Sequence, residues 1–257
     1  MIFISPLRYH ITDAPRKGDI KITNASSGDF VYTPREGKRG SDSFSIRAVD
    51  EFGGWSEPVK INIKINKSSS NIKYADMTGH WAYNAALKMT DSGVMGGAYV
   101  DGDAYFYPEQ SVNREDFVVM LMKTIGLSEV PETDKTVFAD DGEISDEAKK
   151  YVSAARKLGF ISGSRDGGEL VFNPASTITR AEVAVILQNI IGVEVDDAIT
   201  VFSDTDSIPA WAVESVYAMR QLGIMNGTGN QTFSPNGTLS RAQTAMILSS
   251  VSELVVD

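Results

Sequence analysis

The stretch STITRAEVAVIL, from Ser176 to Leu187, decides how this chain is organised. Small polar residues give way to an apolar run with helical spacing, which predicts the start of a helix. Two other stretches have the same pattern, QSVNREDFVVML at 110–121 and GTLSRAQTAMIL at 237–248. We therefore expect three equivalent helices, each headed by an arginine.

The sequence around these helices repeats as well. An aspartate after an aromatic and a small residue, a glycine, a Phe-x-Pro and the arginine recur three times in the same order, which marks a tandem repeat. The four sets are Asp76, Asp140 and Asp204; Gly93, Gly159 and Gly223; Phe106, Phe172 and Phe233; Arg114, Arg180 and Arg241. Each unit is predicted to contain a first helix that ends at the glycine in a left-handed C′ position, a short loop and strand, and a second helix.

Each arginine follows a residue suited to cap a helix. Asn113, Thr179 and Ser240 precede the arginines, and Asp116, Glu182 and Gln243 come three residues after the caps. Thr-x-x-Glu and Ser-x-x-Gln are capping boxes, and Asn-x-x-Asp is a looser version. Capping accounts for the polar residues around the arginine but not for the arginine.

A positive charge at the first position of a helix opposes the helix dipole, at a cost of roughly 0.3–1 kcal/mol. One explanation is an anionic ligand, because free N–H groups at a helix N-terminus and a guanidinium fork both bind carboxylate or phosphate. The other is an internal ion pair with the aspartate of a repeat, Asp76, Asp140 or Asp204. The residues alone leave both explanations open.

Charge and composition exclude several classes of function. Residues 1–71 carry a net charge of +3 and residues 72–257 a net charge of −13, so the repeats lack the basic surface that nucleic-acid binding needs. The chain has no cysteine, no apolar run of membrane-spanning length and too short an apolar start for a signal peptide. We expect no membrane insertion and no cofactor, and we expect the chain to be the C-terminal piece of a longer protein.

The text before the repeats is typical of β structure. GDFVYTP, SDSFSIRAVD and PVKINIKI alternate apolar and polar residues, with Val59, Ile61, Ile63 and Ile65 on one face. Three serines and an asparagine then form a linker. The expected boundaries are 1–67 for the β domain, 68–73 for the linker, and 74–128, 136–192 and 199–257 for the repeats.

The ordered motifs resemble those of the S-layer homology (SLH) domain, in three tandem copies. The resemblance covers about residues 72–257 and implies a mainly α domain in which three units form a pseudo-threefold arrangement. It also implies a partner: a pyruvylated secondary cell-wall polymer linked to peptidoglycan, bound in grooves between units. The first part resembles a truncated Ig- or cadherin-like β-sandwich, a spacer. The whole chain would be a multidomain α+β protein on the bacterial cell surface.

The resemblance also implies which residues bind the carbohydrate. A guanidinium suits the carboxylate of a pyruvyl ketal, and a glycine lets a sugar approach the backbone. An aromatic ring can stack on a sugar, although Trp81 and Trp211 at helix starts are also expected to be core anchors. We favour the grooves of Arg180 and Arg241, because VNRED around Arg114 departs from the motif. The implied binding residues are Arg180, Arg241, Arg114, Asp76, Asp140, Asp204, Trp81, Trp211, Gly97, Gly163 and Gly227.

Other readings of the sequence are weaker. His10 and His80 are 70 residues apart and support no catalytic triad. Asp140 and Asp141 could serve a glycosidase, and Asp50 and Glu51 a Ca²⁺ site, but solvated surface and turn chemistry explain them better. We therefore expect no catalytic and no metal-binding residue, and a non-enzymatic anchor. The alternative is the tail of an extracellular polysaccharide-degrading enzyme whose catalytic domain lies elsewhere.

Overall fold

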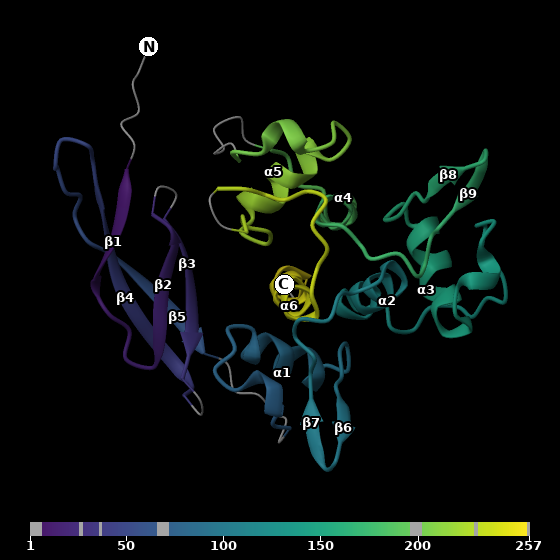
Figure 1. The fold of residues 1–257 in the computed structure, drawn as a ribbon, viewed down its shortest axis with the longest axis horizontal. Coiled ribbons are helices and arrows are strands. Elements are labelled where there is room, and N and C mark those ends of the chain that lie inside the picture. Colours follow the sequence, from purple (N-terminus) through teal and green to yellow (C-terminus); the bar gives the residue numbers. More distant parts are fainter. Residues whose placement is uncertain are drawn as a thin grey trace.

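The computed structural model describes residues 7–25, 28–35, 38–65, 72–195, 202–228 and 231–255. They form two parts, a β module (residues 7–65) and a repeat domain (residues 72–255), shown in Figure 1. Most of the expected linker, 68–73, lies outside the described residues.

The β module contains five described strands in two antiparallel sheets. The orders are β1-β4-β5 and β2-β3, and the strands are β1 Arg8–Asp13, β2 Gly18–Asn24, β3 Asp29–Pro34, β4 Gly40–Val49 and β5 Val59–Ile65. Phe44 of β4 is buried and packs edge-on against Phe30 of β3, with ring centroids 4.9 Å apart. These rings join the two sheets. The predicted apolar face of β5 is confirmed towards its end, where Ile65 is buried, whereas Val59 is exposed.

Carboxylates organise two loops of this module. Asp42 accepts hydrogen bonds from the N–H groups of Arg16 and Lys17 and from the hydroxyl of Tyr32. Burial opposes ionisation of Asp42, but these hydrogen bonds outweigh it and hold the pKa of this carboxyl well below its ordinary value. In the turn after β4, Asp50 Oδ1 accepts from the N–H groups of Phe52 and Gly54, as turn chemistry requires.

The repeat domain has two helices in each unit. The first helices are α1 Tyr83–Asp91, α3 Asp146–Lys157 and α5 Val213–Gln221. The second helices are α2 Arg114–Thr124, α4 Arg180–Ile191 and α6 Arg241–Val255, and they begin at the three predicted arginines. Small hairpins, β6 Ala98–Val100 with β7 Asp103–Tyr105 and β8 Ser164–Asp166 with β9 Glu169–Val171, lead to the first two Phe-x-Pro motifs. One 3-10 turn, at Ala75–Met77, Asp141–Glu143 or Thr205–Ser207, precedes each first helix.

The glycine that follows each first helix has the predicted left-handed backbone. Gly93, Gly159 and Gly223 have φ of 69°, 79° and 69°. A side chain is disfavoured in this conformation, which explains why glycine ends all three helices.

The three segments that lead into the second helices pair with one another. Val112 N–H donates to Leu239 O (3.0 Å), and Ile178 N–H donates to Val112 O (3.2 Å). Residues 177–181 in turn pair with residues 235–239, through an antiparallel bridge between Thr179 and Thr238. The extended segments thus form a central hub from which α2, α4 and α6 start.

The helices pack between repeats rather than within them. α3 packs on α2 of the preceding repeat, α5 packs on α4, and α1 of the first repeat packs on α6 of the third. Figure 1 shows α6 near the middle, with α1, α3 and α5 around it. The three repeats therefore close a ring around one apolar core, which includes Phe117, Ile178 and Leu248. Among the described residues, no helix has the length and apolar character needed to cross a membrane.

Candidate functional site

The start of each second helix is capped as the sequence predicts. Thr179 and Glu182 form both bonds of a capping box, and so do Ser240 and Gln243. Asn113 accepts from the N–H of Asp116 (2.7 Å), the looser version expected in the first repeat. This part of the motif stabilises the helix start.

The expectation of free N–H groups at these helix starts is wrong. The first two N–H groups of each second helix donate to carbonyls of another repeat; Arg180 N–H, for example, donates to Gly237 O and Ala181 N–H to Pro235 O. The third donates to the cap side chain of its own helix. The hub that joins the repeats consumes these donors, so a ligand at a helix end would find them occupied.

Arg180 and Arg241 reach into the next repeat of the ring. Arg180 Nε donates to Phe233 O and Nη2 to Asn226 O, each at 2.7 Å, with the guanidinium 4.7 Å from the centre of the Phe233 ring. Arg241 repeats this arrangement with Phe106 O, Gly96 O and the Phe106 ring. The guanidinium charge therefore faces carbonyl oxygens and an aromatic face, which compensates for its place near the positive end of the helix. Burial lowers the pKa of Arg180 to about 10, so it stays charged at neutral pH.

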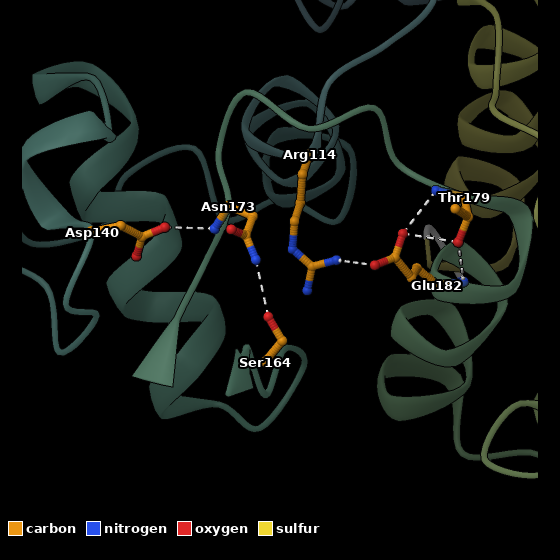
Figure 2. A network of polar contacts seen from close by, with 6 residues as sticks. All are labelled: Arg114, Asp140, Ser164, Asn173, Thr179 and Glu182. Carbon is orange, nitrogen blue, oxygen red and sulfur yellow. Dashed lines mark hydrogen bonds and ion pairs between the residues drawn. The ribbon is translucent and has the colours of Figure 1, made fainter. Parts of the chain in front are cut away.

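Arg114 takes a different partner. Figure 2 shows its side chain pointing to Glu182, and the Arg114 Nη1 to Glu182 Oε1 distance is 2.9 Å. Glu182 uses its other oxygen for the Thr179 cap. Arg114 Nε is buried and has no hydrogen-bond partner within the described ranges. Burial lowers the pKa of Arg114, while Glu182 opposes this shift. The residues VNRED depart from the arginine motif of the other repeats, and their arginine has its positive charge balanced by a glutamate inside the protein.

The repeat aspartates bind backbone rather than arginine. Asp140 accepts from the N–H groups of Phe172 (2.8 Å) and Asn173 (2.7 Å), and Asp76 and Asp204 bind the other two Phe-x-Pro motifs in the same way. The middle residue of each motif has φ between 56° and 58°, a left-handed conformation that the aspartate holds. No ion pair joins a motif arginine to a repeat aspartate in the part of the chain that the structure describes. The predicted ion pair between a motif arginine and a repeat aspartate is therefore wrong.

The second glycine of each loop is required by packing. A Cβ on Gly163 would lie 2.8 Å from Val171 O, and one on Gly227 would lie 2.8 Å from Thr232 O. At Gly97 it would collide with Tyr105 O and the Tyr74 ring. These glycines let the loop cross closely over the strand or loop that follows, which explains their recurrence without a ligand.

The tryptophans are not core anchors. Trp81 is 39% exposed and Trp211 is 60% exposed, because Ala82 and Ala212 point into the core instead and are fully buried. The His80 and Trp81 rings lie 5.3 Å apart at the start of the first repeat. An exposed ring remains able to contact a ligand or another module.

One pocket of about 250 Å³ contains a motif arginine. It lies between α2 and the loop after α1, and its polar lining comprises Gln110, Ser111, Asp116 and Arg241, with Gly96 at its edge. A Cβ on Gly96 would meet nothing within 4 Å. Gln110, Ser111 and Gly96 were not predicted; the one signal was the extra glycine in GVMGG, where the other loops have Ser162 and Asn226.

The polar groups of this pocket carry both signs of charge. Arg241 Nη1 has no hydrogen-bond partner among the described residues, so it can donate into the pocket. Asp116 lies at the start of α2, and burial, followed by the charge of Glu115, raises its pKa, while Arg241 and Asn113 act against the shift. The pocket can therefore bind a carboxylate at Arg241 and a hydroxyl or amide N–H at Asp116.

Neither aspartate of the pair 140–141 is free for catalysis. Asp140 holds the Phe-x-Pro of its repeat, and Asp141 accepts from Thr136 N–H (2.6 Å) and pairs with Lys149 (3.4 Å). Hydrogen bonds from Thr136 lower the pKa of Asp141, which keeps it ionised. A glycosidase needs one carboxyl held protonated, and the lowered pKa of Asp141 is the opposite of that requirement.

Comparison with known proteins agrees with the repeated architecture. The model of the S-layer homology domain matches residues 73–118, 137–184 and 201–245, which together make up more than half of the chain. The chain belongs to the S-layer homology family. Each match includes the repeat aspartate, the glycine loop and the arginine at the start of the second helix.

The SLH repeats of this chain are similar to parts of much longer proteins. An amylopullulanase of Thermoanaerobacterium thermosulfurigenes is 29% identical over 68% of this chain, and an exoglucanase of Acetivibrio thermocellus is 28% identical over 69%. An S-layer protein of Bacillus anthracis is 30% identical over 66% of the chain. The matched parts make up 9%, 16% and 19% of these relatives.

Proposed function

We propose that this chain anchors a larger surface protein noncovalently to the bacterial cell wall, by binding an anionic, pyruvylated secondary cell-wall polysaccharide. The observation that carries the proposal is the pocket at Arg241, where a guanidinium edge, a carboxylate and uncharged polar groups line one cavity of about 250 Å³. Membership in the SLH family supports it, and so does the similarity to an S-layer protein and to two polysaccharide-degrading enzymes.

The charge of the repeats makes a local cation necessary. Residues 72–257 carry a net charge of −13, which repels an anionic polymer on average. A carboxylate must therefore meet a guanidinium at short range, where a bidentate, charge-assisted hydrogen bond outweighs the distant repulsion. Arg241 offers this contact at the pocket, whereas Arg180 is buried and Arg114 is paired with Glu182. We assign the principal groove to Arg241.

A second cavity continues along α2 and suits a polymer better than a single sugar. It has a volume of about 480 Å³, its polar lining includes Lys88, Lys123 and Glu253, and it shares Val94 with the first pocket. Lys88 is paired with Glu253, and Lys123 lies 3.5 Å from Glu147, so both lysine charges are balanced inside the chain. Several sugars would run along α2 from the Arg241 pocket, with the acidic group at Arg241.

The remaining predictions are part of the same proposal. The three repeats would form a pseudo-threefold domain with one groove between each pair of units, and the β module would be a partial Ig- or cadherin-like spacer. The protein would be extracellular, at the cell wall or S-layer surface. A second candidate, favoured by the relatives named above, is that this anchor serves an enzyme that degrades polysaccharides.

The test is co-sedimentation with purified cell-wall sacculi. Gly96→Glu places a carboxylate in open space at the pocket and should abolish binding to the pyruvylated polymer. Gly142→Glu is the matched control, because Gly142 also has open space around it but lies on the 3-10 turn of the second repeat. Removal of the pyruvyl groups should also abolish binding. Full retention after either treatment would refute the proposal.

A further inference from the structure

The β module lies against a groove that corresponds to the one at Arg241. Residues five positions after each motif arginine, Val119, Val185 and Met246, occupy equivalent places on α2, α4 and α6. Met246 of α6 lines a cavity together with residues of α1 and of the β module, and Figure 1 shows the β module beside α1 and α5. We call this the third groove because it lies in the third repeat. It would be built from α6, the loop after α5 and Arg180.

On the α5 side, an ion pair joins the β module to the last turn of that helix. Asp29 at the start of β3 accepts from Arg220 Nη2 at 2.7 Å, with only 22% and 15% of the two side chains exposed. Arg220 also donates to the side chain of Asn226. Asn226 O in turn accepts from Arg180 Nη2. A chain of contacts through Arg220 and Asn226 thus links the β module to Arg180, the motif arginine of this groove.

On the α6 side, strands β3 and β5 face the helices across a cavity of about 320 Å³. Tyr32, Pro34 and Ile63 line one wall, and the facing wall includes Trp81, Met246 and Ser249. A second cavity of about 530 Å³ separates the β2–β3 hairpin from the loop at 226–228. The two parts of the chain are therefore joined by the ion pair on the α5 side and face each other across these two cavities.

We infer that the β module is the occupant of the third groove and closes it to the wall polymer, an inference that rests on the proposed function. The residues that would bind sugar there, Met246 and the loop around Asn226, face strands of the same chain. The two cavities show that the interface is loosely packed, and one partly exposed ion pair holds its α5 side. A small, loosely packed contact between modules of this kind can open and close.

The absence of cysteine makes the contact measurable. Met246→Cys reports on the third groove, and Val119→Cys, at the equivalent place on α2, is the matched control. Met246 is 39% exposed and Val119 is half-buried, so small molecules reach both places and access of a bulky reagent is what distinguishes them. Each variant is labelled in the full chain with a small maleimide and with a polyethylene-glycol maleimide. The rate ratio is the labelling rate with the polyethylene-glycol maleimide divided by the rate with the small maleimide. We expect the bulky reagent to be excluded at residue 246, so this ratio should be at least about tenfold lower there than at residue 119. Equal ratios would overturn the inference.

Charge reversal tests the ion pair. Asp29→Arg should raise the rate ratio at Met246→Cys by about tenfold, because like charges then face each other, and leave Val119→Cys unchanged. Adding Arg220→Asp should restore protection, which unfolding of the β module would not. Protection that survives charge reversal would overturn the role of the ion pair.

These assays use no glycan, so they separate the two proposals. Protection at residue 246 without any binding to sacculi would contradict the proposed function and leave the contact between modules standing.

Discussion

Replacing Arg180 with methionine should destabilise the repeat domain strongly. Methionine keeps much of the length of the side chain but donates no hydrogen bond, so Phe233 O and Asn226 O lose their partners. Phe233 is fully buried, so its unsatisfied carbonyl costs about 1–3 kcal/mol, whereas Asn226 is exposed and water can replace the bond to its carbonyl. Loss of the contact with the Phe233 ring, 4.7 Å away, adds about 0.5–2 kcal/mol.

Removing the buried charge also removes its desolvation cost, which offsets part of this loss, and we expect a net loss of about 1–4 kcal/mol in the free energy of unfolding. For a chain of this size the melting temperature should fall by roughly 2–16 °C. The assay is urea and thermal unfolding of the full chain, followed by circular dichroism and by the fluorescence of Trp81 and Trp211.

Two comparisons make the result specific. Arg165→Met is the control, because Arg165 is exposed on β8 and bonds within its own hairpin, and it should change stability by less than about 0.5 kcal/mol. Arg180→Lys keeps the charge but loses the planar fork, so it should lie between the two. A loss below about 1 kcal/mol for Arg180→Met would refute the reasoning that this arginine joins the repeats.

Three further predictions concern other sites. Gly97→Ala should destabilise the repeat domain by about 1–3 kcal/mol in urea unfolding, because its Cβ collides with Tyr105 O, whereas Gly96→Ala next to it should be neutral; equal effects would contradict the packing argument. Asp116→Asn should tighten binding of a pyruvylated fragment by about threefold to tenfold in calorimetric titration at neutral pH, since a negative charge leaves the pocket. Because the pKa of Asp116 is raised, acidification should also tighten binding of the unaltered chain while the ligand stays ionised, and the Asn variant should not respond. The lowered pKa of Asp42 stabilises the β module at pH values above the unfolded-state pKa of about 3.9. This contribution should vanish as the pH falls from there towards the folded-state pKa. The urea midpoint, followed by Trp55 fluorescence, should therefore depend less on acid pH in the Asp42→Asn variant than in the unaltered chain.

The sequence predicted local features well because their causes are local. Caps, C′ glycines and the first residues of α2, α4 and α6 depend on neighbours within a few positions, and all three agree with the structure. The strand at β5 and the turn at Asp50 follow for the same reason.

The partners of the motif residues could not be read from the sequence. Arg180 and Asp204 bind carbonyls and N–H groups of Phe233 and its neighbours, and backbone groups carry no residue type that a pattern could reveal. The arginine partner also lies in another repeat, 53 residues away, so only the closed ring shows it. The exposure of Trp81 and Trp211 likewise depends on which side of a helix start the chain buries, and the neighbouring alanines decide it.

The closed ring has a consequence for synthesis of the protein. The pocket in the first repeat gains its arginine from α6, which follows every other helix of the ring in chain order. A ribosome must therefore complete residues 241–255 before the first repeat has either its packing partner for α1 or the arginine of its pocket. Under the proposed function, a chain that stops early would lack the principal groove, so attachment to the wall would select for molecules translated through their last helix.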